Sequence, residues 1–376
     1  MSAGAHLFAP LELRDAVTRN RIAISPMQQF MAQDGMPSPW HHVHLGQFAL
    51  GGAGIVFTEA MAVSERGRIS YGDMGLWRIE QADAMRPLTD FIRSTGTRPG
   101  AQISHAGRRG AITAPWHGKR PLRQEDAACG ASPWALWAPS PIANRKEAQT
   151  PVALDAGMIE QVQSEYVRAA HLADLAGFDV LELHGGHGYM LHAFLSPLSN
   201  QRRDAYGGSR EKRMRFVLEV VERVRATWPA NKPLFFRVSC FDGVSGGWEM
   251  DDTLALVPSL LARGVDVIDV SSGGLGGLSS NAAEHTRTPG YHVPMSARIR
   301  EATGARTQVV GLITEAAQAD AIVRSGAADL VALARESLRD PYWAAHASET
   351  LGAVDYAVWP EQYAWWLRAR REHLSQ

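Results

Sequence analysis

The sequence predicts an α/β protein in which one parallel (β/α)8 TIM barrel fills most of the 376-residue chain. Eight short apolar or β-branched runs recur along the chain, and each ends at a polar or glycine-rich turn. Segments with helical periodicity separate these runs, which favours parallel strands with helices outside them. No GxGxxG sequence follows the first run, so the main alternative, an open doubly wound sheet, lacks support.

The eight expected strands are apolar on both faces, as strands between a barrel interior and an outer layer of helices should be. A first clear helix is expected at 156–175, where Asp155 can cap the start and Gly177 follows the end. A second helix is expected at 210–227 and stops before Pro229. The strands are expected, in order, at 21–24, 55–58, 101–104, 180–183, 234–238, 265–270, 308–311 and 330–333.

We expect one domain over residues 1–376, with two additions to the barrel. The connection at 110–154 is rich in proline, lacks helical periodicity and is too long for an ordinary barrel loop. Because its tryptophans would be costly to expose, we interpret it as a cap over the C-terminal mouth of the barrel, with a disordered insertion as the alternative. A C-terminal tail at 345–376 is the second addition. The tryptophans of the cap are Trp116, Trp134 and Trp137.

The balance of charges argues against a polyanionic partner. The formal net charge is -1 and no block of Lys or Arg occurs, so a small molecule is expected to bind rather than nucleic acid or a membrane surface. Two cysteines, Cys129 and Cys240, without CxxC spacing fit a reducing compartment. The first residues lack the apolar core of a signal peptide and no run reaches membrane-spanning length, so we expect a cytoplasmic protein.

The residues at the ends of the expected strands are unusually polar. In barrels of this kind the C-terminal ends of the strands surround the active site, so these side chains are expected to converge at one mouth. Any one of them alone could be an ordinary structural polar group, but their convergence favours a site. They are Ser25 and Gln28, Glu59 and Ala60, Gln102 and His105, His184 and His187, Arg237, Ser271 and Ser272, and Arg335.

His184, His187 and Tyr189 follow the fourth strand within one tight, glycine-containing turn. Two imidazoles three residues apart can direct two N–H donors at one oxygen, which would stabilise negative charge that develops on that oxygen. A phenol is neutral at working pH and can give up a proton. A zinc pair is the alternative, since HxxH also suits zinc, but no HExxH glutamate and no obvious set of carboxylate ligands accompany it.

A second group of histidines, His41, His42 and His44, also suggests a metal. These residues fall in an expected helix between the first and second strands, away from the barrel mouth. We therefore expect them to have a surface or packing role.

The segment VLELHGGHGYMLHAFLSPLSNQRRDAYGGS, around the fourth strand and its turn, is one of several blocks at the ends of successive strands. In this order the blocks resemble the Old Yellow Enzyme family, NADH:flavin oxidoreductases that include ene-reductases. The resemblance covers nearly the whole chain, and its spacing is closest to the bacterial thermophilic-like subgroup, which has a short barrel and a contributing C-terminal tail. The other blocks are SPM at 25–27, GGAGIVFTEA at 51–60, AQISHAGRRG at 101–110, FRVS at 236–239 and ADLVALARESLRDPYW at 328–343.

The resemblance implies FMN across the barrel mouth, with NADPH or NADH as the hydride donor. Arg237 would stabilise negative charge on the reduced flavin. The phosphate would bind backbone amides after the last two strands. Ala334 stands where the family pattern leads us to expect glycine, which puts a close backbone approach in doubt. The implied cofactor-binding residues are Ser25, Pro26, Met27, Gln28, Ala60, Gln102, Arg237, Gly311, Ala334 and Arg335.

The resemblance also implies a reaction. His184 and His187 would bind the oxygen of an α,β-unsaturated carbonyl or nitro compound, hydride would pass from flavin N5 to its β-carbon, and Tyr189 would protonate the α-carbon. Quinone or nitro-group reduction within the same family is one alternative. Dienoyl-CoA reductases and amine dehydrogenases of the superfamily carry an iron–sulfur cysteine cluster and extra domains that this chain lacks. From other classes, a flavin-free metal-dependent barrel hydrolase and a binding protein remain open.

Three residues depart from the pattern of the bacterial subgroup. Gln28 and Phe30 stand where a cysteine that touches the flavin and a tyrosine that contacts the substrate usually occur. Gln28 could donate an N–H to the flavin edge but offers no thiol, and Phe30 would favour apolar substrates. Trp365 stands where relatives often place an arginine that reaches a neighbouring subunit's site. It could stack on substrate or nicotinamide or pack an interface, and both readings imply a homodimer or homotetramer with the tail at the interface.

Overall fold

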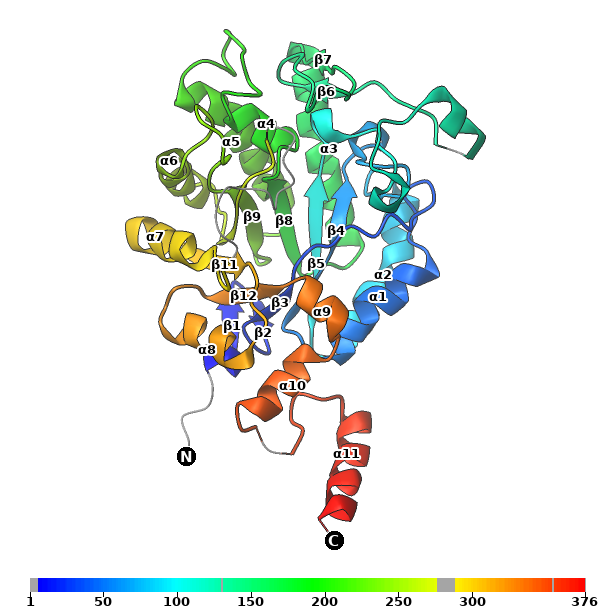
Figure 1. Ribbon diagram of the computed structural model, residues 1–376, viewed down its shortest axis with the longest axis vertical. Helices are drawn as coiled ribbons and strands as arrows, with labels where there is room; N and C mark the ends of the chain where they lie inside the picture. Colours follow the sequence, from blue (N-terminus) through cyan, green and yellow to red (C-terminus); the bar gives the residue numbers. More distant parts are fainter. Residues whose placement is uncertain (1–5, 130, 276–287, 354, 376) are drawn as a thin grey trace.

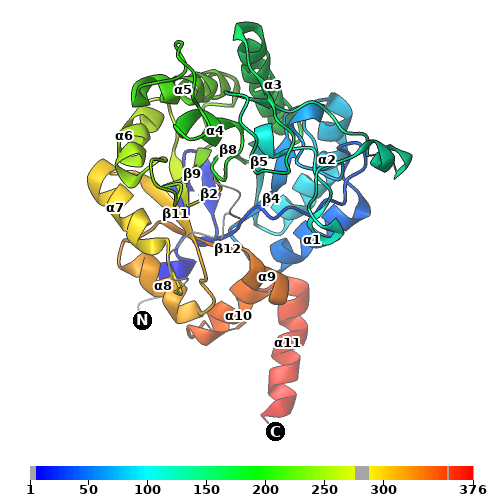
Figure 2. The same cartoon turned by 45° about the horizontal axis from the view of Figure 1, so that its top comes forward.

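The computed structural model describes residues 6–129, 131–275, 288–353 and 355–375, and within them eight parallel strands close into a barrel. Helices surround the barrel on its outside (Figures 1 and 2). This arrangement confirms the predicted fold class. The strands, in their order around the barrel, are β3 (Ile22–Ile24), β4 (Ile55–Ala62), β5 (Arg98–Ser104), β8 (Val180–Gly185), β9 (Leu234–Ser239), β10 (Val267–Ser271), β11 (Arg306–Val310) and β12 (Leu330–Leu333), which pairs again with β3.

Six strands extend beyond their predicted limits, and two of them, β4 and β5, do so by three or more residues. Strand β4 continues past residue 58 because the register of its pairing with β5 shifts between Phe57 and Ala60, so the chain passes an irregularity and resumes the ladder. Strand β5 begins before residue 101 although Pro99 and Gly100 look like turn residues. A Cβ at Gly100 would lie only 2.6 Å from Cδ1 of Phe57, so glycine is needed here to accommodate the neighbouring ring.

The two clearest predicted helices have the limits that their caps indicate. The Asp155 side chain accepts a hydrogen bond of 2.8 Å from the backbone N–H of Met158 at the start of α3. Within the described residues, no helix has the length and apolar character needed to cross a bilayer. The helices are α1 (Pro39–Leu50), α2 (Ile79–Ser94), α3 (Ala156–Leu175), α4 (Met190–Leu195), α5 (Arg210–Thr227), α6 (Met250–Leu261), α7 (Val293–Thr303), α8 (Ala316–Arg324), α9 (Arg335–Arg339), α10 (Trp343–Thr350) and α11 (Glu361–Leu374).

A short hairpin that the sequence patterns did not predict lies at the N-terminal end of the barrel. Its strands are β1 (Leu11–Leu13) and β2 (Ala16–Thr18), which pair antiparallel. The buried leucines of β1 belong to one apolar cluster with inward-facing residues of the barrel strands, including Phe57, Phe235 and Leu330. This cluster fills the lower end of the barrel and leaves the opposite end, where the strands terminate, for the site.

The segment predicted as a cap contains short 3-10 turns and one small strand pair, β6 (Trp137–Ala138) with β7 (Val152–Ala153). Trp134 is half-buried and its Nε1 donates to the backbone oxygen of Arg66 at 3.1 Å. The expectation that the cap tryptophans are buried is wrong for Trp116, which is 60% exposed. Its ring meets that of Phe30 edge to face with centroids 5.7 Å apart, and the ring of His117 lies 6.3 Å from it.

The C-terminal tail leaves the body of the barrel. Helix α10 is largely buried, but α11 extends away from the barrel in both views (Figures 1 and 2, red). Trp365 and Trp366 on α11 are 57% and 69% exposed, and their rings touch each other edge to face. An apolar pair exposed to this extent is typical of a surface that another molecule covers.

Candidate active site

A cavity of about 460 Å3 lies at the C-terminal mouth of the barrel. Its size falls in the range of small-molecule and cofactor sites. The structure brings together there nearly all of the predicted site residues, because each follows a barrel strand and the strands end at one rim. The predicted residues that line it are Ser25, Pro26, Met27, Gln28, Ala60, Gln102, His184, His187, Tyr189, Arg237, Gly311, Ala334 and Arg335.

Five residues that were predicted at the mouth do not line this cavity: Glu59, His105, Ser272, Phe30 and Trp365. Phe30 lines a neighbouring cavity of about 390 Å3, which also reaches Gln28 and Tyr189. Trp365 lies on α11 and, within the described chain, lines neither of these two cavities. Its role toward a neighbouring subunit, by stacking on a ligand or by packing an interface, remains a prediction.

The turn after β8 places three rings against one another. The His184 ring contacts those of His187 and Tyr189 edge to face, with both pairs of centroids 4.9 Å apart. His187 has φ +58°, a left-handed conformation that is uncommon outside glycine. The turn is held in part by the Ser239 hydroxyl, which accepts a 3.0 Å hydrogen bond from the His187 backbone N–H. Such a strained backbone is typical of residues fixed for a function.

The protonation states of these rings follow from their surroundings. Burial, and then the positive charge of Arg237, lower the pKa of His184 well below its ordinary value, and burial also lowers that of His187. The Gly186 N–H donates to His184 Nδ1 at 3.2 Å, so the proton of this neutral ring is on Nε2. Burial raises the pKa of Tyr189, which keeps its phenol protonated. The turn thus offers uncharged hydrogen-bond donors.

Two residues at the site were not predicted to position this turn. Ser271 Oγ lies 2.7 Å from His187 Nε2, so the hydroxyl and the imidazole form one hydrogen-bonded unit. Arg109 donates from Nη1 to the backbone oxygen of His187 at 2.7 Å and places its guanidinium 5.6 Å from the centre of the Tyr189 ring. The sequence patterns indicate Ser271 only as a polar residue at a strand end and Arg109 only as a member of the AQISHAGRRG block.

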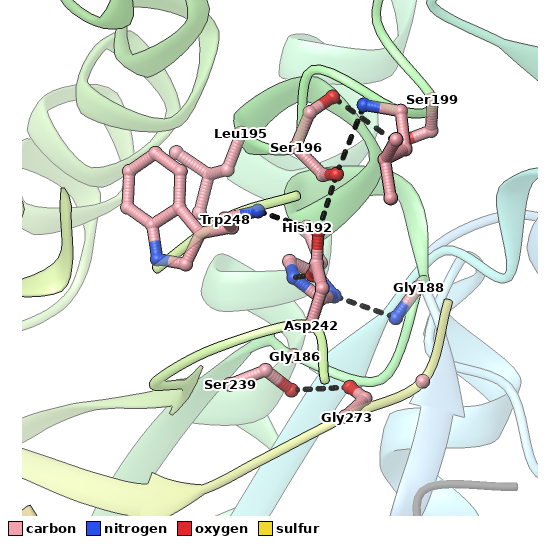
Figure 3. A network of polar contacts seen from close by, with 12 residues as sticks. Gly186, Gly188, His192, Leu195, Ser196, Ser199, Ser239, Asp242, Trp248 and Gly273 are labelled. Atoms are coloured by element: carbon pink, nitrogen blue, oxygen red, sulfur yellow. Dashed lines mark hydrogen bonds and ion pairs between the residues drawn. The ribbon is translucent and has the colours of Figure 1, made fainter. Parts of the chain in front are cut away.

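Behind the turn, a buried polar network connects α4 to the loop after β9 (Figure 3). The Gly188 N–H donates to His192 Nδ1 at 2.8 Å, so the proton of a neutral His192 is on Nε2, which lies 2.9 Å from Asp242 Oδ1. The other carboxylate oxygen accepts from Ser196 Oγ at 2.6 Å and from the Trp248 N–H at 2.7 Å. His192 is therefore a positioning residue that fixes the backbone next to Tyr189.

We predict that Asp242→Asn destabilises the fold by about 2–3 kcal/mol near pH 6, because an amide cannot satisfy all the donors that now face the carboxylate. Burial alone would raise the pKa of Asp242, but His192 and the Ser196 and Trp248 donors outweigh burial and hold the pKa below 3.8. The stabilisation is therefore complete above pH 3.8 and disappears as pH falls below it. Urea unfolding at several pH values measures the difference in unfolding free energy between the original protein and Asp242→Asn. An equal difference at pH 3 and pH 6 would contradict this account. Ser196→Ala, which removes one donor, should cost only about 1 kcal/mol.

Below the cavity, Arg237 is the cation nearest to two fully buried carboxyl groups. Its Nε lies 3.4 Å from Asp269 Oδ2, and its Nη1 donates to Ser25 Oγ at 3.0 Å. Glu182 accepts a 2.7 Å hydrogen bond from Gln102 Nε2. Burial, and then the Asp269 carboxylate, raise the pKa of Glu182 well above its ordinary range. One guanidinium with two carboxyls leaves this layer close to neutral when Glu182 holds a proton.

The ends of β11 and β12 form the opposite side of the cavity. Gly311 has φ +138°, and a Cβ there would lie 3.0 Å from the Tyr291 ring, so glycine is required. Ala334 has φ -123°, outside the left-handed region that favours glycine. Arg335 starts α9 and lines the cavity. These residues supply a backbone turn and a cation suitable for a phosphate.

Two of the three α1 histidines are buried packing residues and one is at the surface, and His41 lies nearer to the mouth than predicted. His41 is buried with its Nε2 3.2 Å from Glu59 Oε1, and the other Glu59 oxygen accepts from the backbone N–H of Gln29 at the rim. His44 is also buried, whereas His42 is exposed. Among the described residues, no three His, Cys, Asp or Glu side chains gather as a metal-binding group.

The cavity fits a flavin mononucleotide in its polarity as well as its size. Gln28 lines it and has a buried Nε2 without a hydrogen-bond partner in the described protein, which a ring acceptor could satisfy. Ala60 is small enough to leave room for a flat ring. Arg237 on one side and Arg335 on the other provide a cation for each end of a molecule that carries a ring and a phosphate.

The fold and this cavity define a barrel oxidoreductase with a cofactor site at its mouth, and comparisons identify its family. Residues 6–353 match the model of the NADH:flavin oxidoreductase / NADH oxidase family. The chain therefore belongs to this family, that of Old Yellow Enzyme, and is an NAD(P)H-dependent flavin oxidoreductase, which confirms the family suggested by its motifs.

Individual relatives agree along nearly the whole chain. The chain is 38% identical over 360 residues to the NADPH dehydrogenase of Listeria innocua, which covers 95% of this chain and 98% of the relative. It is 37% identical over 359 residues to the NADPH dehydrogenase of Bacillus subtilis, with the same coverage. The solved structure of an Old Yellow Enzyme homologue from Zymomonas mobilis superposes with a TM-score of 0.74 at 21% identity, covering 94% of this chain and 96% of that one, and supports the fold alone.

Proposed function

We propose that the protein is an FMN-dependent ene-reductase that uses NADPH or NADH to reduce activated C=C bonds of α,β-unsaturated carbonyl or nitro compounds. One observation carries this proposal: His184, His187 and Tyr189 form a contiguous set of neutral donors on the wall of the cavity that also contains Gln102 and Arg237. When bound, FMN supplies the hydride chemistry. The full-length similarity to NADPH dehydrogenases supports the choice of nicotinamide donor.

In this reaction each residue of the site has its own role in binding or protonating the substrate. His184 donates from Nε2 to the oxygen of the substrate, and this hydrogen bond strengthens as negative charge develops on that oxygen. Ser271 holds the His187 ring in place through the hydrogen bond between its Oγ and Nε2. Tyr189 gives its proton to the α-carbon. Arg237 would stabilise the negative charge of a reduced flavin.

Anaerobic half-reactions test this function. The protein is reduced with NADPH or NADH in a stopped-flow instrument and is then mixed with cyclohexenone, N-phenylmaleimide or β-nitrostyrene. The proposal predicts that at least one alkene reoxidises the flavin rapidly and gives the saturated product. Rapid reoxidation by menadione or a nitroarene with no alkene active would replace the proposal by the quinone or nitro reductase alternative. A protein that takes up no FMN would exclude both.

We predict that the rate of the oxidative half-reaction changes little between pH 6.5 and pH 10. The pKa values of His184 and His187 are lowered from 6.5 and that of Tyr189 is raised from 10.0, so none of these groups titrates inside that window. The rate should fall only above pH 10, when Tyr189 loses its proton. Single-turnover rates with a non-ionising alkene measure the profile, and a midpoint near pH 7 would contradict these protonation states.

We also propose that α11 joins two copies of the chain, because Trp365 and Trp366 form an exposed apolar pair on a helix that leaves its own barrel. Light scattering after size exclusion should give a multiple of the 41.0 kDa chain mass. The double substitution Trp365→Asp and Trp366→Asp should give a monomer without lowering the melting temperature of the barrel. Val43→Asp, an exposed apolar position on α1 outside α11 and outside both cavities, is the matched control. A monomeric unmodified protein would overturn this assembly.

A further inference from the structure

A second cavity adjoins the mouth cavity on the side of Tyr189 and has an unusual lining. It measures about 390 Å3 and shares Gln28 and Tyr189 with the mouth cavity, so the two are neighbours at the catalytic turn. Its walls come mainly from the start and the end of the cap segment. Four cationic side chains line it, and no carboxylate does among the described residues: Arg108, Arg109, Lys119 and Arg145.

These cations lack anionic partners within the described chain. None of the four forms an ion pair with an Asp or Glu, and the hydrogen bonds of Arg109 and Arg145 go to backbone oxygens. Arg108 is only 4% exposed, yet its Nε has no hydrogen-bond partner. Burial, and then the charges of Arg109 and Arg145, lower the pKa of Lys119. Like charges gathered in a partly buried pocket are stabilised by an anion that binds among them.

Apolar side chains make up much of the remaining lining, beside the polar Gln28, Asn144, Gln149 and Tyr189. Phe30, which replaces a tyrosine expected at this position, faces the cavity together with side chains that can hold a ring or a short hydrocarbon chain. A ligand that fits would have a hydrophobic body against these apolar walls and a negative group toward Lys119 and Arg145. The apolar members are Phe30, Ile69, Ile112, Pro115 and Leu136.

We propose that this cavity is a substrate subsite, and that the oxidising substrate is an amphipathic alkene with an anionic carboxylate or phosphate group at the end remote from its activated double bond. This inference rests on the ene-reductase function proposed above and names the class of substrate. Lys119 and Arg145 bind the anion, while the apolar walls hold the body of the molecule. The phosphates of a nicotinamide nucleotide share this chemistry, so the experiment has to separate the two sources.

Three matched maleimides provide the probes: N-(4-carboxyphenyl)maleimide, its meta isomer and the neutral N-(4-carbamoylphenyl)maleimide. The oxidative half-reaction of the NADPH-reduced holoenzyme is measured with each. We expect kcat/KM for the better carboxylate to exceed that for the carboxamide by about tenfold or more, because a hydrogen-bonded charge pair contributes roughly 1.5–3 kcal/mol. Lys119→Met and Arg145→Met should each reduce this ratio, and together bring it to about one. Lys146→Met, which removes an exposed charge from the same cap outside the cavity, should preserve it.

Other results of these measurements would contradict the subsite or the proposed function. A ratio near one in the unmodified enzyme overturns the subsite. Variants that weaken NADPH and NADH binding in the reductive half-reaction and leave the ratio unchanged assign the cations to the nucleotide and also overturn it. If no maleimide reoxidises the flavin, the ene-reductase function fails, and the subsite is then tested by binding. N-(4-carboxyphenyl)succinimide should still perturb the flavin absorbance at lower concentration than the carboxamide, and equal affinities would exclude the subsite independently.

Discussion

Replacing Tyr189 by Phe is expected to slow the reduction of an alkene at least about 100-fold, because a positioned proton donor contributes roughly 10²–10⁴ to such a step. The ring itself should stay in place. Phe can keep the edge contact with His184 and the position below the Arg109 guanidinium, since both involve the ring and not the hydroxyl. The effect therefore isolates the loss of the proton.

Two controls make this prediction specific. Reduction of the Tyr189→Phe enzyme by NADPH should proceed within about twofold of the original rate, because the hydroxyl has no proton to deliver in that half-reaction. Reoxidation by menadione should also be unaffected, since a quinone needs no protonated carbon. Equal slowing with menadione and with an alkene would show that the substitution distorts the turn, and an unchanged alkene rate would assign the proton to another group.

Replacing Arg237 by Met is expected to lower the reduction potential of the bound flavin by about 30–60 mV. The guanidinium offers a charged hydrogen bond worth about 1.5–3 kcal/mol to an anionic reduced cofactor, and 1.4 kcal/mol corresponds to about 30 mV for a two-electron couple. Spectroelectrochemistry with a reference dye measures the shift. Arg237→Lys should lower the reduction potential less than Arg237→Met does, because lysine keeps the positive charge without the planar guanidinium.

The effect of Arg237→Met on folding stability has to be measured separately from its effect on the flavin reduction potential. Without Arg237, the Asp269 carboxylate is buried without its cation, and breaking a buried pair in this way costs about 3–5 kcal/mol. Adding Asp269→Asn to Arg237→Met should restore much of that stability. It should leave the potential low, because the stabilising charge is still missing. A double variant that regains the original potential would show that Arg237 acts only by supporting the fold.

The sequence was sufficient to predict the ring of residues at the mouth because a barrel has a simple rule of placement. Ser25, Gln102, His184 and Arg237 each lie at or just after a strand, and strands that are parallel and closed bring such positions to one rim whatever their separation in the chain. The same rule could not place Phe30 or Trp365, since one lies on a rim loop and the other on a helix that leaves the domain.

Contacts that depend on the path of a loop could not be predicted in this way. Arg109 reaches the His187 carbonyl, and His192 reaches Asp242, across long stretches of chain whose approach is not encoded by any local period. Strands of three residues, such as Leu11–Leu13, are too short for alternation to reveal them. The exposed Trp116 shows a further limit, because hydrophobicity indicates that a side chain is better covered but not whether its own chain covers it.

Among the described residues, the hairpin and its apolar cluster fill the lower end of the barrel, and the cavity lies at the opposite end. Under the proposed function, nicotinamide and alkene would both enter at this end and would compete for the same space. We therefore expect each reactant to inhibit binding of the other, so that the turnover rate declines when both are at high concentration. Substitutions of the β1 leucines would change the stability of this apolar end of the barrel without changing the competition at the mouth.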